Sequence, residues 1–307
     1  VSSAIWLEPM TKLHDVMVQL QTPIIRDLAW TIGAPSSLAI PHHPEICTDS
    51  YFEELLKTNS DWLFDLDRNP QSLISRLSTI PVHRLGLYFE TLIHFWLDQS
   101  SRWHIRAYNH QVKGRTGTFG AFDFVMGDGV ETQHWEVAIK YYLGIDGKRD
   151  WCHWIGPNQR DRLDLKMDKM MNHQINLSIH PLGKTALNEL GIQTVSKRRI
   201  WIKGLFFRPW RTESDGPLYA TSKPDDVWID EQDINDYLAS CTPNTYWTIR
   251  SKPDWMCPIP TDDLERLSRP QLVRLSKSIQ RPAMLSEMMP SMMWERRRLF
   301  LVSKAWR

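Results

Sequence analysis

The sequence lacks most of the signals of a secreted or membrane protein. Its four cysteines are widely spaced and form no CxxC pair, which argues against a zinc knuckle and against a disulfide-dense scaffold. It contains no uninterrupted apolar stretch of about 18 residues or more, so we expect no membrane span. The N-terminal residues do not follow the charged, apolar and small-residue order of a signal peptide, and we expect a cytoplasmic protein with reduced thiols.

An excess of one charge is also missing. The 37 Lys and Arg residues nearly balance 36 Asp and Glu residues, which leaves a net charge of +1 with His neutral. No global field therefore attracts nucleic acid, and any such binding must come from local patches. With 307 residues and 42% apolar residues, the chain is long enough for one large core with helical additions.

Hydrophobic periodicity predicts a helix followed by three strands in the first half of the chain. Residues 13–66 look helical in patches, with a loop at 33–44, and RLGLYFETLIHFWLDQ at 84–99 has apolar residues close to a 3.6 period. Strand-like alternation begins at Trp103 and continues in GTFGAFDFVMGDG and HWEVAIKYYL. Three successive strands, with a tight Gly-Asp-Gly turn between the last two, indicate an antiparallel meander.

The remaining segments predict an α/β or α+β fold, with a central mixed sheet flanked by helices. We expect a helix at 161–178, strands at 198–207 and 244–250, and a helical C-terminal part from Thr261 that ends in WERRRLFLVSKAWR. The expected sections are a helical N-terminal part (1–80), a core (81–215) and a C-terminal extension with a basic, aromatic tail (216–307).

Two acidic residues and a lysine on the predicted meander point to metal-dependent chemistry. Side chains on a strand alternate between its faces, so Glu136 and Lys140 project from the same side, and Asp123 lies on the neighbouring strand. Carboxylates within such apolar strands are costly unless they are paired, and a divalent cation such as Mg²⁺ would satisfy both acids. A plain ion pair between Glu136 and Lys140, with Asp123 accepting from a backbone donor, is the structural alternative.

The order of these elements resembles the PD-(D/E)XK nuclease superfamily. The segments RLGLYFETLIHFWL, GAFDF, HWEVAIKYYL and GPNQRDRLDLK together resemble an uncharacterised bacterial domain-of-unknown-function family of that superfamily, over roughly residues 84–210. The resemblance implies a restriction-endonuclease-like core, with Asp123 as a metal-binding acid, Lys140 as the motif lysine and Glu90 as the acid of the first core helix. It also makes Gln174 a candidate site residue, since some branches direct a helix glutamine into the site.

The sequence departs from the superfamily pattern at two alanines. Ala138 stands where the acid two residues before the lysine is expected, so Glu136 would have to replace it. Two residues of strand move a Cα by roughly 6.6 Å, which puts that replacement in doubt. Ala121 occupies a second position where an acid is expected. Both departures keep open a protein that retains the fold but not the activity.

Further side chains are candidates for binding nucleic acid. Arg162, Lys166 and Lys169 recur at i, i+4 and i+7 of the predicted helix, where they either hold phosphates or form a solvated face paired with nearby aspartates. The same choice between substrate contact and ordinary surface or core packing applies to Lys113, Arg115 and Tyr142.

Two other features have open roles. His134 shares a strand face with Glu136, as either an outer contact of the site or a structural histidine. The basic run 296–298 near the C-terminus suits contact with nucleic acid or a partner, or belongs to a helix docked on its own domain.

These features predict a Mg²⁺-dependent nuclease, with Mn²⁺ as a substitute and DNA favoured over RNA. Asp123, Glu136 and Glu90 would hold the metal, and Lys140 would orient the attacking water. The alternative is an inactive nuclease-fold protein that binds nucleic acid or a protein partner. A structural subunit that uses its aromatic tail, or a homo-oligomer, is a further hypothesis.

Overall fold

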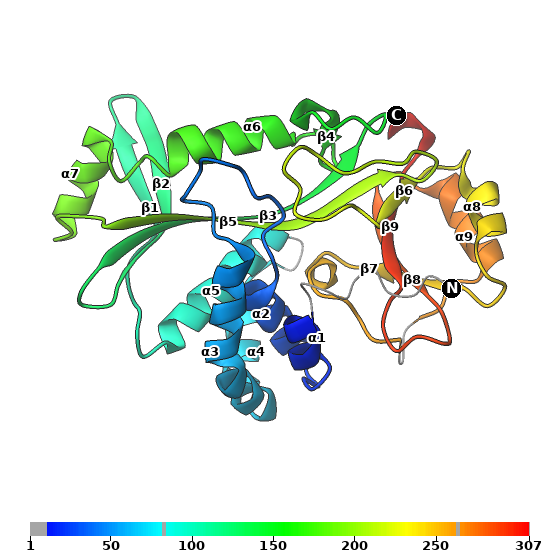
Figure 1. Ribbon diagram of the computed structural model, residues 1–307, viewed down its shortest axis with the longest axis horizontal. Coiled ribbons are helices and arrows are strands. Elements are labelled where there is room, and N and C mark those ends of the chain that lie inside the picture. The colour runs from blue at the N-terminus through cyan, green and yellow to red at the C-terminus, as the bar shows by residue number, and fades with distance from the viewer. Residues whose placement is uncertain (1–10, 82–83, 262–264, 307) are drawn as a thin grey trace. The chain divides into compact units, whose positions relative to one another are not determined.

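The computed structural model describes residues 11–81, 84–261 and 265–306 (Figure 1). It confirms a mixed α+β protein, with a sheet whose strands follow the order β1-β2-β3-β5-β6-β9-β8-β7, flanked by helices. The chain forms two compact units, one from residues 1–139 and 166–203 and one from residues 140–165 and 204–307. These units are interleaved along the sequence, and the three consecutive sections expected from the sequence stay a prediction.

The first unit begins with helices and continues into the predicted meander. The helices are α1 (Thr11–Met17), α2 (Pro23–Gly33), α3 (Asp49–Arg68), α4 (Gln71–Leu77) and α5 (Leu85–Gln99). The strands are β1 (His104–Gly114), β2 (Gly117–Gly127) and β3 (Thr132–Gly144), and β1–β2 and β2–β3 both pair antiparallel, as the alternation indicated. The prolines that interrupt the N-terminal region separate its helices, because proline cannot donate an interior helix hydrogen bond.

The predicted helix at 161–178 is shorter and less regular than expected. It consists of α6 (Leu163–Asp168) followed directly by a π-helical turn, η2 (Lys169–Gln174), and α7 (Pro181–Glu189) comes next. In the first unit, η2 and α7 lie on the face of the meander opposite to α5 (Figure 1). A π-helical turn widens the helix and changes which side chains share a face.

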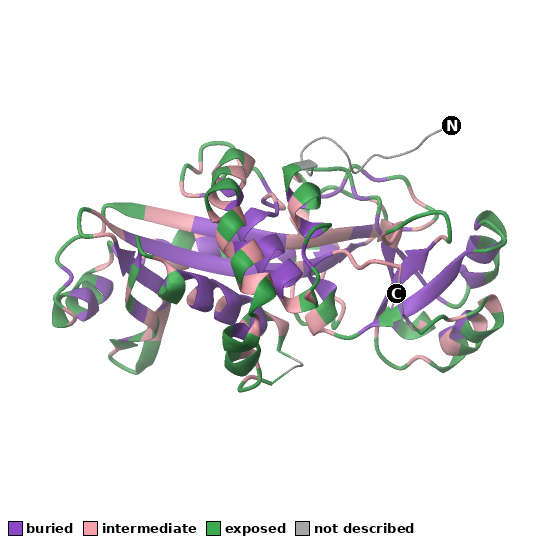
Figure 2. Ribbon diagram, turned by 90° about the horizontal axis from the view of Figure 1, so that it is seen from below, coloured by how far each residue is buried: buried purple, intermediate pink, exposed green. Residues whose placement is uncertain are grey.

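Each face of the meander buries its own apolar cluster. On the α5 side, large aromatic rings pack together, and the centroids of Trp135 and Trp201 lie 4.8 Å apart. On the other side, Phe122 and Val125 of β2 pack with Leu177 and residues of α7. Because both faces are covered, β3 is buried along almost its whole length (Figure 2), and any charged group on it needs a partner.

The second unit contains the rest of the sheet. Its elements are η1 (Trp151–His153), β4 (Trp154–Ile155), β6 (Val227–Ile229), α8 (Ile234–Ser240), β7 (Tyr246–Arg250), η3 (Pro253–Trp255), α9 (Arg269–Ser278), β8 (Ala283–Met288), β9 (Arg297–Leu301) and η4 (Lys304–Trp306). Strand β5 (Lys197–Pro209) begins in the first unit and ends in the second. Strands β5, β6 and β9 pair in parallel, whereas β7–β8 and β8–β9 pair antiparallel.

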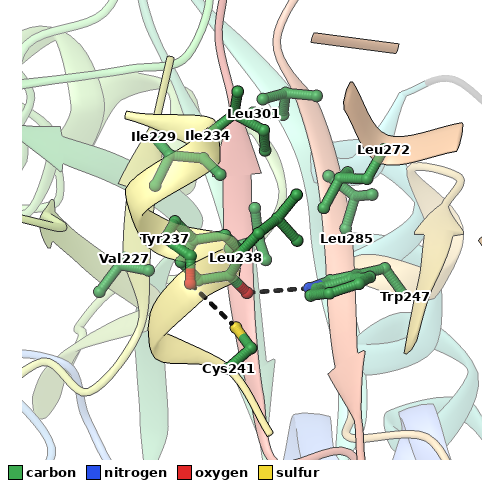
Figure 3. Close-up of a cluster of buried hydrophobic side chains, with 11 residues drawn as sticks. Val227, Ile229, Ile234, Tyr237, Leu238, Cys241, Trp247, Leu272, Leu285 and Leu301 are labelled. Atoms are coloured by element: carbon green, nitrogen blue, oxygen red, sulfur yellow. Dashed lines mark hydrogen bonds between the residues drawn. The ribbon is translucent and has the colours of Figure 1, made fainter. Parts of the chain in front are cut away.

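The core of the second unit is apolar, with a chain of polar groups through it (Figure 3). The indole Nε1 of Trp247 donates to the Tyr237 hydroxyl at 2.8 Å, and that hydroxyl donates to the buried Glu287 carboxylate. These buried polar groups therefore have hydrogen-bond partners.

The prediction of a helical C-terminal part is wrong except for α9. Residues 262–264 of that predicted segment lie outside the described residues, and the basic run at 296–298 leads into strand β9. Arg296 and Arg297 pair with Glu287 at 2.5 and 2.9 Å, and Arg298 pairs with Glu295 at 2.6 Å. These ion pairs explain how a strand can contain buried arginines. The basic run is therefore paired within the protein and does not form the exposed basic tail that the sequence suggested.

Among the described residues, none of the helices combines the length and the apolar character that crossing a membrane requires.

Candidate functional site

The first unit brings two predicted acids together where two strands stop pairing. The β2–β3 ladder runs from Gly127↔Thr132 to Phe124↔Trp135 and ends one residue before Asp123 and Glu136. Beyond that point the backbone N–H of Val137 donates to Asp123 Oδ2 at 2.9 Å, and the Asp123 N–H points to Glu136 Oε1 at 3.5 Å. Carboxylates therefore accept from backbone donors that the ladder leaves unpaired.

Glu136 is fully buried and has a hydrogen-bond partner on each carboxyl oxygen. His134 Nε2 lies 2.8 Å from Oε1, and Gln174 Nε2 donates to Oε2 at 2.7 Å. Burial lowers the pKa of His134 to about 3, so its contact with Glu136 is a hydrogen bond of a neutral ring and not an ion pair. Ser178 Oγ holds the other ring nitrogen at 3.2 Å. His134 and Gln174 together fix the position of Glu136.

Three acids at or near this site have their pKa raised by burial. Burial raises the pKa of Asp123 to about 7, and the Glu136 carboxylate contributes to the same rise. Burial raises the pKa of Glu136 to about 7 as well. Glu90 of α5 has its pKa raised to about 7 by burial and by the Asp123 charge. The Asp123 carboxyl group therefore interacts with each of the other two, and this proximity of like charges disfavours their full ionisation unless a cation is added.

Lys166 is a cation that acts on all three acids. Its charge lowers the pKa of Glu90, Asp123 and Glu136, in each case against the effect of burial. Its ammonium also donates to Gln174 Oε1 at 3.5 Å, and Gln174 Nε2 reaches Glu136. The predicted phosphate-binding residue Lys166 and the candidate Gln174 therefore both belong to the acid cluster.

A pocket of about 290 Å³ lies beside Asp123, and all its lining residues belong to the first unit. The β2 side consists of residues 118–121 together with Asp123, and Lys169, His173, Gln174 and Leu177 supply the opposite side. The absence of a side chain at Gly120 leaves room there, since a Cβ at this position would lie 3.3 Å from the Leu177 side chain. The pocket therefore offers an acid, an amide and a cation to a small group that enters it.

Other predicted site residues have different surroundings. The Lys140 ammonium forms an ion pair with Asp161, and the Tyr142 hydroxyl donates to the same carboxylate at 3.4 Å. Tyr142 is buried, as the packing alternative expected.

The other predicted basic residues are either paired within the protein or exposed. Arg162 precedes α6 and pairs with Asp164 at 2.7 Å, so it does not share a helix face with Lys166 and Lys169 as predicted. Lys113 and Arg115 are exposed at the turn between β1 and β2.

Sequence patterns did not indicate His173 or the partner of Lys140. His173 lines the pocket beside Gln174, and its Nε2 lies 3.1 Å from the Phe119 carbonyl oxygen. Two adjacent residues of a regular helix point in different directions, and the π-helical turn explains why both face the pocket. Asp161 is 21 residues from Lys140, and no local pattern indicates that pair.

The donor set fits a cation held by few protein ligands. Within residues 11–81, 84–261 and 265–306, no group of three or more His, Cys, Asp or Glu side chains is arranged to hold a metal ion. Mg²⁺, however, is commonly bound through one or two carboxylates and keeps several waters. Asp123 and Glu136 offer two carboxyl groups for that mode of binding, although both oxygens of Glu136 already contact protein groups.

The fold and the site together define an α+β protein with a buried acid cluster at the end of a strand ladder. The chain belongs to the family described as "Domain of unknown function (DUF1853)", which it matches over residues 26–302. Neither the curated proteins nor the solved structures include a match to this chain.

Proposed function

We propose that this protein is a metal-dependent phosphodiesterase that hydrolyses nucleic acid, with DNA favoured over RNA. The observation that carries the proposal is the meeting of Asp123 and Glu136 at the end of the β2–β3 ladder, beside a pocket that Asp123 and Lys169 line. The sequence resemblance to PD-(D/E)XK nucleases supports the same reaction class.

Asp123 and Glu136, with Glu90, would hold Mg²⁺ or Mn²⁺. Such an ion polarises a phosphoryl oxygen and lowers the pKa of water. The residues of the chain then have separate tasks: His134 and Gln174 hold Glu136 in place, and Lys169 offers a positive charge to a phosphate in the pocket. The role of Lys140 in orienting water also stays a proposal, and it requires the ammonium to leave Asp161.

A second candidate is a nuclease-fold protein that binds nucleic acid, or a protein partner, without turnover. It is favoured by Ala138 in the place of the motif acid, and by Glu136, whose two oxygens already accept from or contact protein groups. If Glu136 keeps these contacts when metal is added, it cannot bind the metal. The protein would then bind nucleic acid without cleaving it.

The two candidates are separated by a cleavage assay on linear and circular DNA, single-stranded DNA and RNA, with Mg²⁺, Mn²⁺ or a chelator. Asp123→Asn and Glu136→Gln are each expected to lower metal-dependent cleavage by about 100-fold or more, because each removes an electrostatic contribution to the transition state. Glu189→Gln, at an exposed acid on α7, is the matched control and is expected to cut like the wild type.

Cleavage that survives in both site variants would refute the proposal, since it would come from another site or from a contaminant. Binding of DNA by the wild type without any cleavage would favour the second candidate.

A further inference from the structure

The Gln174 side chain connects a lysine to the buried acid. Its carbonyl oxygen accepts from the Lys166 ammonium at 3.5 Å, and its amide nitrogen donates to Glu136 Oε2 at 2.7 Å. Gln174 also lines the pocket beside Asp123. A single amide therefore joins a cation on α6 with a carboxyl group on β3, at the wall of the pocket.

The two ends of this amide are not interchangeable. An amide oxygen only accepts hydrogen bonds and an amide nitrogen only donates them. If the amide turned over, its nitrogen would face the Lys166 ammonium and this contact would become repulsive. Its oxygen would face the Glu136 carboxyl, and that contact would be repulsive too when Glu136 is ionised. The positive charge of Lys166 therefore favours the one orientation in which Gln174 can hold Glu136.

The local backbone supplies the geometry for this link. Lys166 lies in α6, and Gln174 is the last residue of the π-helical turn η2. The two residues are eight positions apart. Lys166 is half-buried, whereas Lys169, at the start of η2, is exposed. The two lysines therefore have different surroundings, and Lys166 is the one that contacts the amide.

We propose that Lys166 is a positioning residue of this site, which fixes the Gln174 amide and, through it, the carboxyl group of Glu136. The effect of Lys166 on catalysis rests on the proposed function, whereas the contacts from Lys166 to Gln174 and from Gln174 to Glu136 do not depend on it. This positioning task differs from the water-orienting role that the sequence pattern predicts for Lys140, whose ammonium is paired with Asp161. The electrostatic action of Lys166 on Glu90 and Asp123 is consistent with the same place in the site.

The experiment compares Lys166→Met and Lys166→Arg with the wild type, with Lys184→Met as a control at an exposed lysine of α7. The rate of oligonucleotide cleavage is measured against substrate concentration with Mg²⁺. Lys166→Met is expected to lower kcat by about 10- to 100-fold, as removal of supporting contacts around metal ligands does, with KM little changed. Lys166→Arg should recover most of kcat, because its guanidinium also donates to the Gln174 oxygen, and Lys184→Met should match the wild type.

A rise in KM alone would overturn the proposal, since it would make Lys166 a phosphate-binding residue. An arginine variant as impaired as the methionine variant would also overturn it, because the charge would then have no role.

A second readout does not depend on cleavage. The side-chain NH₂ signals of Gln174 in ¹H–¹⁵N spectra are expected to shift in Lys166→Met and to stay unchanged in Lys184→Met. If the wild type cuts no substrate, the proposed function fails, and these signals alone decide the link. Unchanged Gln174 signals in Lys166→Met would refute it.

Discussion

Asp123 carries a carboxyl group that folding makes harder to ionise. Burial and the nearby Glu136 charge raise its pKa from 3.8 to about 7. Between these values the folded chain binds a proton at Asp123 that the unfolded chain has lost. Stability from this group is therefore greatest at low pH and decreases as pH rises towards 7. A bound divalent cation removes that penalty, because it pairs with the ionised form.

The first prediction concerns Asp123→Asn without metal. The amide keeps an acceptor for the Val137 N–H but carries no charge, so the variant should gain free energy of unfolding relative to the wild type as pH rises from 5 to 8. The expected gain in free energy of unfolding at pH 8 is on the order of 1–2 kcal/mol. A pKa shift of one unit corresponds to about 1.4 kcal/mol, and the partial exposure of the Asp123 side chain weakens the effect. Urea unfolding at several pH values in the presence of a chelator measures it.

Comparison with the wild type at each pH is essential here. Folding lowers the pKa of His134 from 6.5 to about 3, so the folded protein loses stability at this residue as pH falls below 6.5. This effect is opposite in direction to that of Asp123, where stability is lost as pH rises. Subtracting the free energy of unfolding of the wild type from that of Asp123→Asn at each pH removes the effect of His134 that both proteins share. A difference that does not change between pH 5 and 8 would contradict the raised pKa of Asp123.

Period-two alternation predicted some of these residue contacts and not others. It placed His134 and Glu136 on one face of β3, and the two side chains are hydrogen-bonded. The short turn between β2 and β3 predicted that Asp123 lies close to Glu136, which the neighbouring ladder and the Asp123 N–H contact with Glu136 confirm. Period-two alternation did not indicate Lys166 as the cation near Asp123 and Glu136, because the sequence pattern of a strand does not show which helix residue packs against that strand.

At the scale of elements, the sequence predicted the three strands of the meander and missed strand β9. Strands β1 and β2 mix polar and apolar positions, and their segments were correctly expected. Strand β9 is buried on nearly every residue and contains two arginines, so it shows no period of two. The glutamates that neutralise these arginines lie on other segments, and a single stretch of sequence cannot reveal them.

A second prediction belongs to the packing of β3 against β5, which are neighbours in the sheet. Gly204 of β5 has φ +132°, and a Cβ at this position would overlap the backbone carbonyl of Lys140. Gly204→Ala therefore requires a strained backbone and a displaced strand, and we expect it to lower the free energy of unfolding by about 3 kcal/mol or more. Chemical denaturation measures the change.

Gly86→Ala is the matched control for this substitution. Gly86 lies in α5, where a Cβ would meet nothing within 4 Å and the backbone is not in a left-handed conformation. Alanine there should be neutral or stabilise the helix by up to about 1 kcal/mol. Equal effects of the two substitutions would show that the approach of Gly204 to Lys140 does not constrain the sheet.

At the scale of the whole molecule, the chain passes from one compact unit to the other inside β3, α6 and β5. Local periodicity reports which face of an element is buried and not which elements pair, so it could not predict this interleaving. The family match at residues 26–302 includes residues of both units and extends on either side of the segment 84–210 that carries the nuclease resemblance. The family match therefore covers most of both units and is not confined to the nuclease-like segment.

Charge is the property of the whole molecule that bears most directly on nucleic-acid binding. The net charge is +1, and the basic run at 296–298 is engaged with Glu287 and Glu295. Arg162 is engaged with Asp164, and Lys166 with Gln174. The exposed basic candidates at or near the site are Lys113, Arg115 and Lys169. Few phosphate contacts are therefore expected.

The last prediction is a weak dependence of duplex DNA binding on salt. Each phosphate contact contributes about −0.9 to the slope of log K against log salt concentration, so three contacts give a slope of about −3, and a further contribution from residues 296–298 would make it about −5. Fluorescence anisotropy with a labelled duplex and Ca²⁺ in place of Mg²⁺, over a range of salt concentrations, measures the slope. Lys169→Gln should reduce its magnitude by about 1, while Arg296→Gln should leave it unchanged. A steeper slope that Arg296→Gln reduces would show that this arginine leaves Glu287 to bind phosphate, and that the second unit takes part in binding.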